Sequence, residues 1–243
     1  MVRAKSEQQF KTEADLCAAF LAWLKGYPEW TPYAETEAWD ILLAHSDGTQ
    51  VGIQAKLKFN ISVLTQAVQN WSAWSAVGPD FRAILVPEHQ GHRDLCDALG
   101  LTLIRPQNRW NGKIEFEPDF SERTFRTWHY ANPVKRHTLP AYVPDVPAGV
   151  PSPSSLTKWK IAALQISAIM ELRGYVTRHD FRIAGIDYRR WTQDWLEPVP
   201  EQKAAWRWRN GVNQGFQHQH PTIYPKIMAE VRDKGLAAEG MLL

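Results

Sequence analysis

The spacing of apolar residues at the start of the chain predicts a helix followed by a β-hairpin. Apolar residues recur at helical spacing over 16–24, after a capping-box sequence formed by Thr12 and Asp15. Two β-like runs follow, at 39–44 and 50–57, and a polar loop of His, Ser, Asp, Gly and Thr separates them. The polar loop between two apolar runs is the signal for the hairpin.

The segments beyond the hairpin continue the alternation of elements. In chain order they are a helical pattern at 63–76, a compact apolar run at 81–86, a helical pattern at 92–99 and a second apolar run at 101–104. Strands that alternate with helices favour a mixed sheet covered by helices. The expected fold class of this part is therefore α/β.

A proline-rich stretch divides the chain. Residues 131–155 contain six prolines and show no periodic pattern, which indicates a stiff linker or a strap over the surface. We therefore expect a first domain over 1–130, a proline-rich linker over 131–155 and a smaller, mainly helical domain over 156–243.

Composition narrows the class of protein. Hydrophobic residues make up 44% and charged residues 22%, which is ordinary for a soluble globular protein. No apolar run is long enough to span a membrane, and residues 1–11 lack the apolar core of a signal peptide. Cys17 and Cys96 are expected to be small buried residues in a reducing compartment. These features predict a soluble, cytoplasmic protein with no membrane partner, and a homodimer is compatible with them.

Charge is distributed unevenly between the two expected domains. The chain has a net charge of +2, with 28 Lys and Arg against 26 Asp and Glu. From Ser154 onward there are 13 Lys and Arg against 9 Asp and Glu, a balance of +4, so the preceding part carries −2. The basic excess predicts that a polyanion such as DNA binds the C-terminal domain.

The pattern after residue 156 predicts a helix-turn-helix. A largely apolar helix is expected over 156–173, and Thr177 with Asp180 forms a second capping box that opens a short helix ending at Gly185. Asp187 is placed to cap a further helix over 188–196. A short helix, a turn containing Gly and a second helix are the parts of that motif.

Five polar side chains of this domain are candidate DNA contacts. Arg189, Arg190 and Gln193 would lie on the exposed face of the second helix, and their groups suit phosphates and base edges. Arg207 and Arg209 alternate with tryptophans, a pattern that suits nucleic acid and equally suits packed tryptophans with exposed arginines. A generic helical domain with a solvated basic face remains the alternative.

The apolar residues of the hairpin define its register. If Ala44 pairs with Gln50, Ile41 lies opposite Ile53 and one face of the hairpin is wholly apolar, as a sheet packed on a helix requires. A one-residue slip would scatter this apolar set over both faces. The pattern therefore predicts this pairing.

The same register brings chemistry-bearing residues together. Asp40 lies opposite Gln54, and Lys56 follows on the same face. A carboxylate and an amide carbonyl are oxygen ligands for Mg²⁺, and Lys56 would orient a water or stabilise charge on a phosphate. Glu13 lies one turn before the inward stripe of the first helix and is expected to point to the same place, with Glu35 or Glu37 within reach.

These residues carry a resemblance to a known family. The runs Glu37-Ala-Trp-Asp40-Ile-Leu-Leu and Val51-Gly-Ile-Gln54-Ala-Lys56 resemble the D…(E/Q)xK signature of the PD-(D/E)XK, or restriction-endonuclease-like, nucleases, in the Gln-bearing form of Mrr-like enzymes. The resemblance implies a mixed sheet flanked by helices, a DNA endonuclease that uses Mg²⁺ or Mn²⁺, and catalytic roles for Asp40, Gln54, Lys56 and Glu13. It implies that Asp40, Gln54 and Glu13 bind the metal.

Other interpretations of the same residues stay open. Gln54 in place of Asp or Glu removes one negative charge, which favours a non-catalytic DNA-binding protein with a nuclease-like fold. The alternation of polar and apolar residues also fits the solvent face of an edge strand, and a first-turn glutamate such as Glu13 is explained by the helix dipole. The twelve tryptophans also fit a protein-interaction or inhibitor module.

Overall fold

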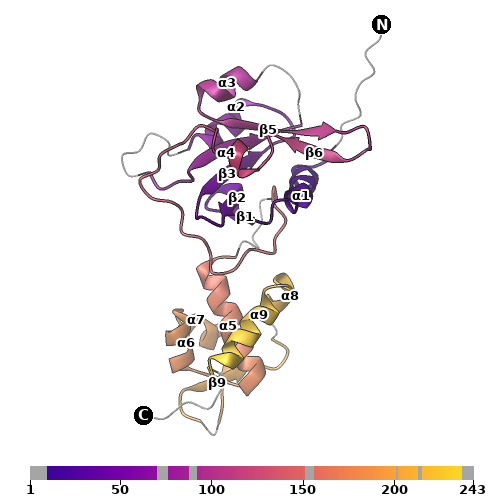
Figure 1. The fold of residues 1–243 in the computed structure, drawn as a ribbon. Helices are drawn as coiled ribbons and strands as arrows, with labels where there is room; N and C mark the ends of the chain where they lie inside the picture. Colours follow the sequence, from indigo (N-terminus) through magenta and orange to yellow (C-terminus); the bar gives the residue numbers. More distant parts are fainter. Residues whose placement is uncertain are drawn as a thin grey trace. The chain divides into compact units, whose positions relative to one another are not determined.

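The computed structural model describes residues 10–69, 76–87, 92–150, 156–200, 202–212 and 215–236. The chain divides into two compact units, Met1–Ser155 and Leu156–Leu243 (Figure 1). The second unit begins where the proline-rich stretch ends. Much of the C-terminal half of the helix expected over 63–76 lies outside the described residues.

The first unit is a mixed sheet with helices on both faces. Its elements are α1 (Glu13–Leu24), β1 (Trp30–Thr36), β2 (Trp39–His45), β3 (Gln50–Ala55), α2 (Ile61–Ala67), β4 (Phe81–Leu85), α3 (Arg93–Ala98), β5 (Thr102–Asn108), β6 (Ile114–Glu117) and α4 (Glu122–Phe125). The sheet order follows the chain from β1 to β6. The pairs β3–β4 and β4–β5 are parallel and the others antiparallel. The expected α/β class is confirmed, whereas β1, β6 and α4 were not predicted.

The predicted hairpin register is confirmed. Ala44 pairs with Gln50, and Ile41 pairs with Ile53. Both isoleucines are fully buried in the core that lies against α1. Burial of one continuous apolar face therefore selects this register, as the side-chain period of two requires.

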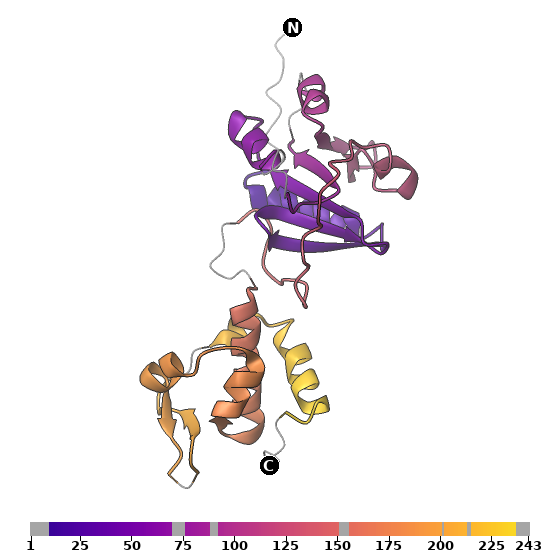
Figure 2. The same cartoon turned by 90° about the vertical axis from the view of Figure 1, so that its left-hand side faces the viewer.

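Two hydrophobic cores cover the two faces of the sheet. On β4 the side chains alternate: Ala83 and Leu85 join the core beneath α1, while Ile84 joins a second core with α2 and α3. Figures 1 and 2 show these helices on opposite sides of the sheet. A central strand buried on both faces is apolar over most of its length, which explains the compact run seen in the sequence. The exception is the buried Arg82, whose guanidinium donates to the carbonyls of Ala67 and Gln69.

Most of the proline-rich stretch belongs to the first unit. Residues 131–150, here called the strap, run over its surface, and Val146 and Ala148 enter the core beside α1. His137 is tied to Gln50 by two hydrogen bonds: its backbone amide donates to Gln50 Oε1 (3.0 Å) and its carbonyl accepts from Gln50 Nε2 (2.9 Å). Of the two alternatives expected for this stretch, a linker or a strap over the surface, residues 131–150 form the strap. Residues 151–155 lie outside the described part of the chain.

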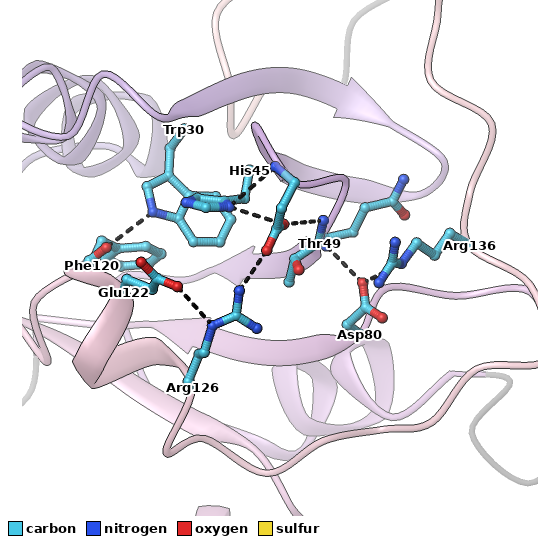
Figure 3. Close-up of polar contacts among 10 residues, drawn as sticks. Trp30, His45, Thr49, Asp80, Phe120, Glu122, Arg126 and Arg136 are labelled. Carbon is cyan, nitrogen blue, oxygen red and sulfur yellow. Dashed lines mark hydrogen bonds and ion pairs between the residues drawn. The ribbon is translucent and has the colours of Figure 1, made fainter.

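A polar network fixes the loop between β2 and β3 (Figure 3). Arg126 Nη2 lies 2.5 Å from Asp47 Oδ2, and Arg136 Nε lies 2.7 Å from the buried Asp80. Burial opposes ionisation of Asp47, but hydrogen bonds from Thr49, His45 and Arg126 outweigh it and hold the pKa of the Asp47 carboxyl below its usual range. The network joins the hairpin loop to α4 and to the strap.

The second unit combines helices with a small sheet. Its elements are α5 (Lys158–Arg173), β7 (Val176–Thr177), α6 (Arg178–Ala184), α7 (Arg189–Asp194), β8 (Leu196–Pro198), β9 (Ala205–Trp208), α8 (Phe216–Gln219) and α9 (Tyr224–Asp233). The strand order is β7–β9–β8. The helix expected over 188–196 ends at Asp194 because Leu196 already pairs with Trp208 in the sheet. The N-cap residue is Tyr188, not Asp187, but the Asp187 carboxylate accepts from the amide of Arg189, the first residue of the helix (2.9 Å).

Candidate active site

Two carboxylates face each other across β1 and β2. Ala34 pairs with Ile41 and Thr36 pairs with Trp39, so Glu35 lies opposite Asp40. Like charges at directly opposed positions of neighbouring strands repel each other and destabilise a sheet. This arrangement therefore favours protonation of one carboxyl or the approach of a cation.

Asp40 is held by the backbone of the neighbouring strand. The Ala55 amide donates to Asp40 Oδ2 (2.7 Å). Burial raises the pKa of the Asp40 carboxyl above its ordinary value and Glu13 raises it further, while the Ala55 hydrogen bond and Lys56 act in the opposite direction. Asp40 is thus a fixed carboxylate in a site that disfavours its charge.

Glu35 is held by the strap. Its Oε1 accepts from the amides of Gly149 (2.7 Å) and Val150 (3.3 Å). Burial is the main cause that raises the pKa of the Glu35 carboxyl, and repulsion from Asp40 adds to it. Glu35 has a left-handed backbone (φ 47°), a conformation that costs free energy in a non-glycine residue and that clusters at functional sites.

Lys56 brings the positive charge of the cluster. Its Nζ lies 2.7 Å from Glu13 Oε2, and both side chains are partly buried. Glu13 is the first residue of α1, so this ion pair links the helix to the end of β3. Lys56 also lowers the pKa of both Asp40 and Glu35, which places it close to both carboxylates.

One carboxylate, Glu13, contacts Lys56, and those of Asp40 and Glu35 interact with it electrostatically. All three carboxylates raise the pKa of the buried Cys17 thiol, after burial itself. Within the described residues, Asp40 Oδ1, Glu35 Oε2 and Glu13 Oε1 have no hydrogen-bond partner. The cluster, defined as Glu13, Glu35, Asp40 and Lys56, has an excess of negative charge and uncommitted carboxylate oxygens.

The cluster is not a closed metal cage. Over the described ranges, no group of three or more His, Cys, Asp or Glu side chains is arranged to hold a metal ion. Binding of a cation there would require the carboxylates to move toward it. Carboxylates on partly exposed side chains can make such a movement, whereas the Asp40 bond to the β3 backbone fixes one ligand in advance.

The side chains of Gln54 and Glu37 contact groups outside the cluster. Gln54 is only 4% exposed, and its Nε2 donates to the Ala38 carbonyl (2.7 Å) at the turn between β1 and β2. Glu37 is in the same turn, and its carboxylate lies 3.6 Å from His137 of the strap. The structure thus brings Asp40, Lys56 and Glu13 together, adds Glu35, and turns the Gln54 amide toward the turn.

Three candidate DNA contacts lie exposed on α7. Arg189, Arg190 and Gln193 are all on the surface of this helix. The Arg190 side chain is 80% exposed and lies 3.9 Å from Asp194, a distance typical of a weak surface pair. These side chains are available to a ligand.

Arg207 in β9 and Arg209 just after it already interact with groups of the second unit. Arg207 Nε lies 2.8 Å from Glu197 of the neighbouring strand. Arg209 donates to the carbonyls of Leu196, Thr192 and Gln193, so it links the C-terminal end of α7 to the sheet. Arg209 therefore positions α7, which its alternation with tryptophans in the sequence did not reveal.

No helix in the described part of the chain is long and apolar enough to cross a membrane. Comparison of the chain with protein-family models, with curated proteins and with solved structures finds no match.

Proposed function

We propose that the protein is a metal-dependent DNA endonuclease whose first unit has a restriction-endonuclease-like fold. The observation that carries the proposal is the opposed pair Glu35 and Asp40 beside Lys56 and Glu13. Partly buried carboxylates with raised pKa values next to a lysine are frequent at catalytic sites, and they support this proposal. The order of α1, the hairpin, α2, β4, α3 and β5 agrees with the order expected from the resemblance.

Each member of the cluster has a distinct role in this proposal. Asp40 and Glu35 would hold Mg²⁺ or Mn²⁺, with Glu13 as the third acidic group. The bound cation supplies an activated water and neutralises charge on the phosphate. Lys56 orients the water or stabilises the negative charge of the phosphate, and Glu13 holds the Lys56 ammonium in place.

Targeting to DNA is the proposed task of the second unit. The helices α6 and α7, joined by a turn through Gly185, would act as a helix-turn-helix with α7 against the DNA. Support comes from the exposed Arg189, Arg190 and Gln193 and from the basic balance of this unit.

A non-catalytic DNA-binding protein is the second candidate. It is favoured by Gln54, which occupies the position of an expected acidic ligand and hydrogen-bonds Ala38. The strap amides of Gly149 and Val150 also satisfy one oxygen of Glu35 without any cation. Both candidates share DNA binding and differ in whether the cluster takes a metal.

Metal titration of the full chain separates the two candidates. We expect Mn²⁺ to bind and to stabilise the folded protein by about 1.4 kcal/mol when its concentration is ten times Kd. Asp40→Asn and Glu35→Gln should weaken this binding, because each removes a charged ligand, while Asp94→Asn on the surface of α3 serves as a matched control. Absence of Mn²⁺ binding to the wild-type protein would favour the non-catalytic candidate.

Gln54→Glu tests the ligand role of this position in the same titration. A carboxylate that joined the cluster would tighten Mn²⁺ binding. Since the Gln54 amide donates to the Ala38 carbonyl, we expect no tightening and a loss of folding stability instead. Tighter binding would show that Gln54 reaches the metal after all.

A further inference from the structure

The second unit contains a hollow between α6 and the start of α7. Its volume is about 420 Å³, and it is lined by Arg178, His179, Phe181, Arg182, Ile186 and Tyr188. This volume falls within the range of pockets that hold small ligands. None of these residues belongs to the proposed α7 interface or to the cluster of the first unit.

Aromatic and imidazole partners position the two arginines of this hollow. The Arg178 guanidinium lies 5.1 Å from the centre of the Tyr188 ring, and that ring stacks on Trp206 at 5.5 Å. Arg182 Nη2 lies 2.7 Å from His179 Nδ1. Both guanidinium groups are thus positioned before any ligand binds, which lowers the entropy lost on binding.

The positive charge of the hollow is not neutralised. Among the described residues, no carboxylate forms an ion pair with Arg178 or Arg182. Asp180, which lies between these two arginines in sequence, is buried and already accepts from Arg173 and Thr177. Two uncompensated guanidinium groups on one helix favour an anion that accepts several hydrogen bonds.

The rest of the lining is apolar. Phe181 is buried beneath the hollow, and Ile186 lies in the turn that follows α6. A cationic rim over an apolar base suits a ligand with a phosphate at one end and a planar, weakly polar body at the other. Mononucleotides have this chemistry.

We propose that this hollow, defined by Arg178, Arg182, His179 and Phe181, binds a nucleotide through its phosphate. Arg178 and Arg182 bind the phosphate oxygens, and the base lies against Ile186. The nucleotide is either free in solution or the phosphorylated end of a DNA strand.

Binding of dAMP to the full chain, measured by calorimetry, tests the proposal. We expect dAMP to bind about tenfold or more tightly than deoxyadenosine, because only dAMP offers the phosphate. Arg178→Gln/Arg182→Gln should weaken dAMP binding by about tenfold or more, whereas Lys226→Gln/Arg232→Gln, which removes two exposed cations of α9, should leave it unchanged.

Circular dichroism checks the fold of the double variant, and Arg178→Lys/Arg182→Lys keeps the charge if the glutamine variant fails to fold. The lysine variant should still bind dAMP more weakly than the wild-type protein, since lysine cannot form the bidentate contact. A 5′-phosphorylated oligonucleotide that displaces dAMP identifies a DNA end as the source, and lack of displacement identifies a free nucleotide.

Absence of dAMP binding, or equal binding of deoxyadenosine, would overturn the proposal. So would dAMP binding that neither double arginine variant weakens. These outcomes are independent of the proposed nuclease activity, because the cluster and the hollow lie in different units. Failure of DNA cleavage therefore leaves the nucleotide measurement informative.

Discussion

Glu35 and Asp40 oppose each other on neighbouring strands, and this arrangement predicts a gain in stability when either charge is removed. Burial raises the pKa of both carboxyls in the folded protein. The folded state therefore binds a proton more readily than the unfolded state, and the associated stability is present below the unfolded pKa and is lost as the pH rises through the folded pKa. The two carboxyls therefore contribute less to the stability of the wild-type protein as the pH rises from acidic to neutral.

We expect Glu35→Gln and Asp40→Asn each to raise the free energy of unfolding by about 0.5–1 kcal/mol at pH 7. The gain should disappear below about pH 3, where both carboxyls are protonated in both states. Urea denaturation at the two pH values measures this. The exposed Asp94→Asn should change stability little at either pH, and a loss of stability at pH 7 in both cluster variants would contradict the explanation.

The sequence pattern indicated some residues of the cluster but not the positions of others. Asp40 and Lys56 were proposed from the apolar register, which the structure confirms from Ile41–Ile53 to Ala44–Gln50. Their roles stay predictions. The direction of the Gln54 side chain depends on the Ala38 carbonyl, in a turn that the sequence pattern does not define. Glu35 was only a possible neighbour, since its left-handed backbone is not visible in the order of residues.

Among the elements of the first unit, the turn between β1 and β2 has a strained backbone. Glu37 and Ala38 are its two central residues, and both have positive φ (53° and 65°), as a type I′ turn requires. Gly and Asn are the residues that adopt this conformation with little cost. Glu37 and Ala38, next to the cluster, therefore adopt a backbone conformation that costs free energy in both residues.

We expect Ala38→Gly to stabilise the first unit by about 1 kcal/mol, because glycine relieves the strain of the left-handed conformation. The denaturant midpoint measures the change. Ala18→Gly, on the exposed side of α1, is the matched control and should destabilise by about 1 kcal/mol. Destabilisation by both substitutions would mean that the turn is not strained at Ala38.

The missed strands have a physical explanation. The edge strand β1 carries Pro32, which is tolerated only where a backbone N–H can face away from the sheet. The strands β8 and β9 have three and four residues, too few for a period-two pattern to stand out. The helix α5, in contrast, was predicted nearly to its ends because Thr157 caps it and Gly174 ends it with a left-handed backbone.

The proline-rich strap shows why composition alone misjudges an element. Proline content indicates stiffness, but it does not show whether a stiff segment is solvated or packed. Here Val146 and Ala148 lie in the core, and strap amides bind Glu35. Contacts between residues far apart in sequence therefore determine that this segment is packed rather than solvated.

For the whole molecule, DNA affinity is expected to reside in the second unit. Arg189→Ala/Arg190→Ala should weaken DNA binding and reduce the slope of log K against log salt by about 2, since two phosphate contacts are lost. Fluorescence anisotropy over a salt series measures both quantities. Lys226→Ala/Arg232→Ala is the control, and equal effects of the two double variants would show that α7 has no special role.

Cleavage of DNA is the most direct test of the central claim that the cluster is a metal-dependent nuclease site. Supercoiled, linear and single-stranded DNA are incubated with the full chain in Mg²⁺ or Mn²⁺ and compared with metal-free controls. We expect metal-dependent cleavage that Asp40→Ala and Lys56→Ala reduce by about 10²-fold or more, while Lys58→Ala, two residues further and exposed, retains it. Cleavage that survives both cluster substitutions, or a wild-type protein that cuts none of these DNA forms, would contradict the account.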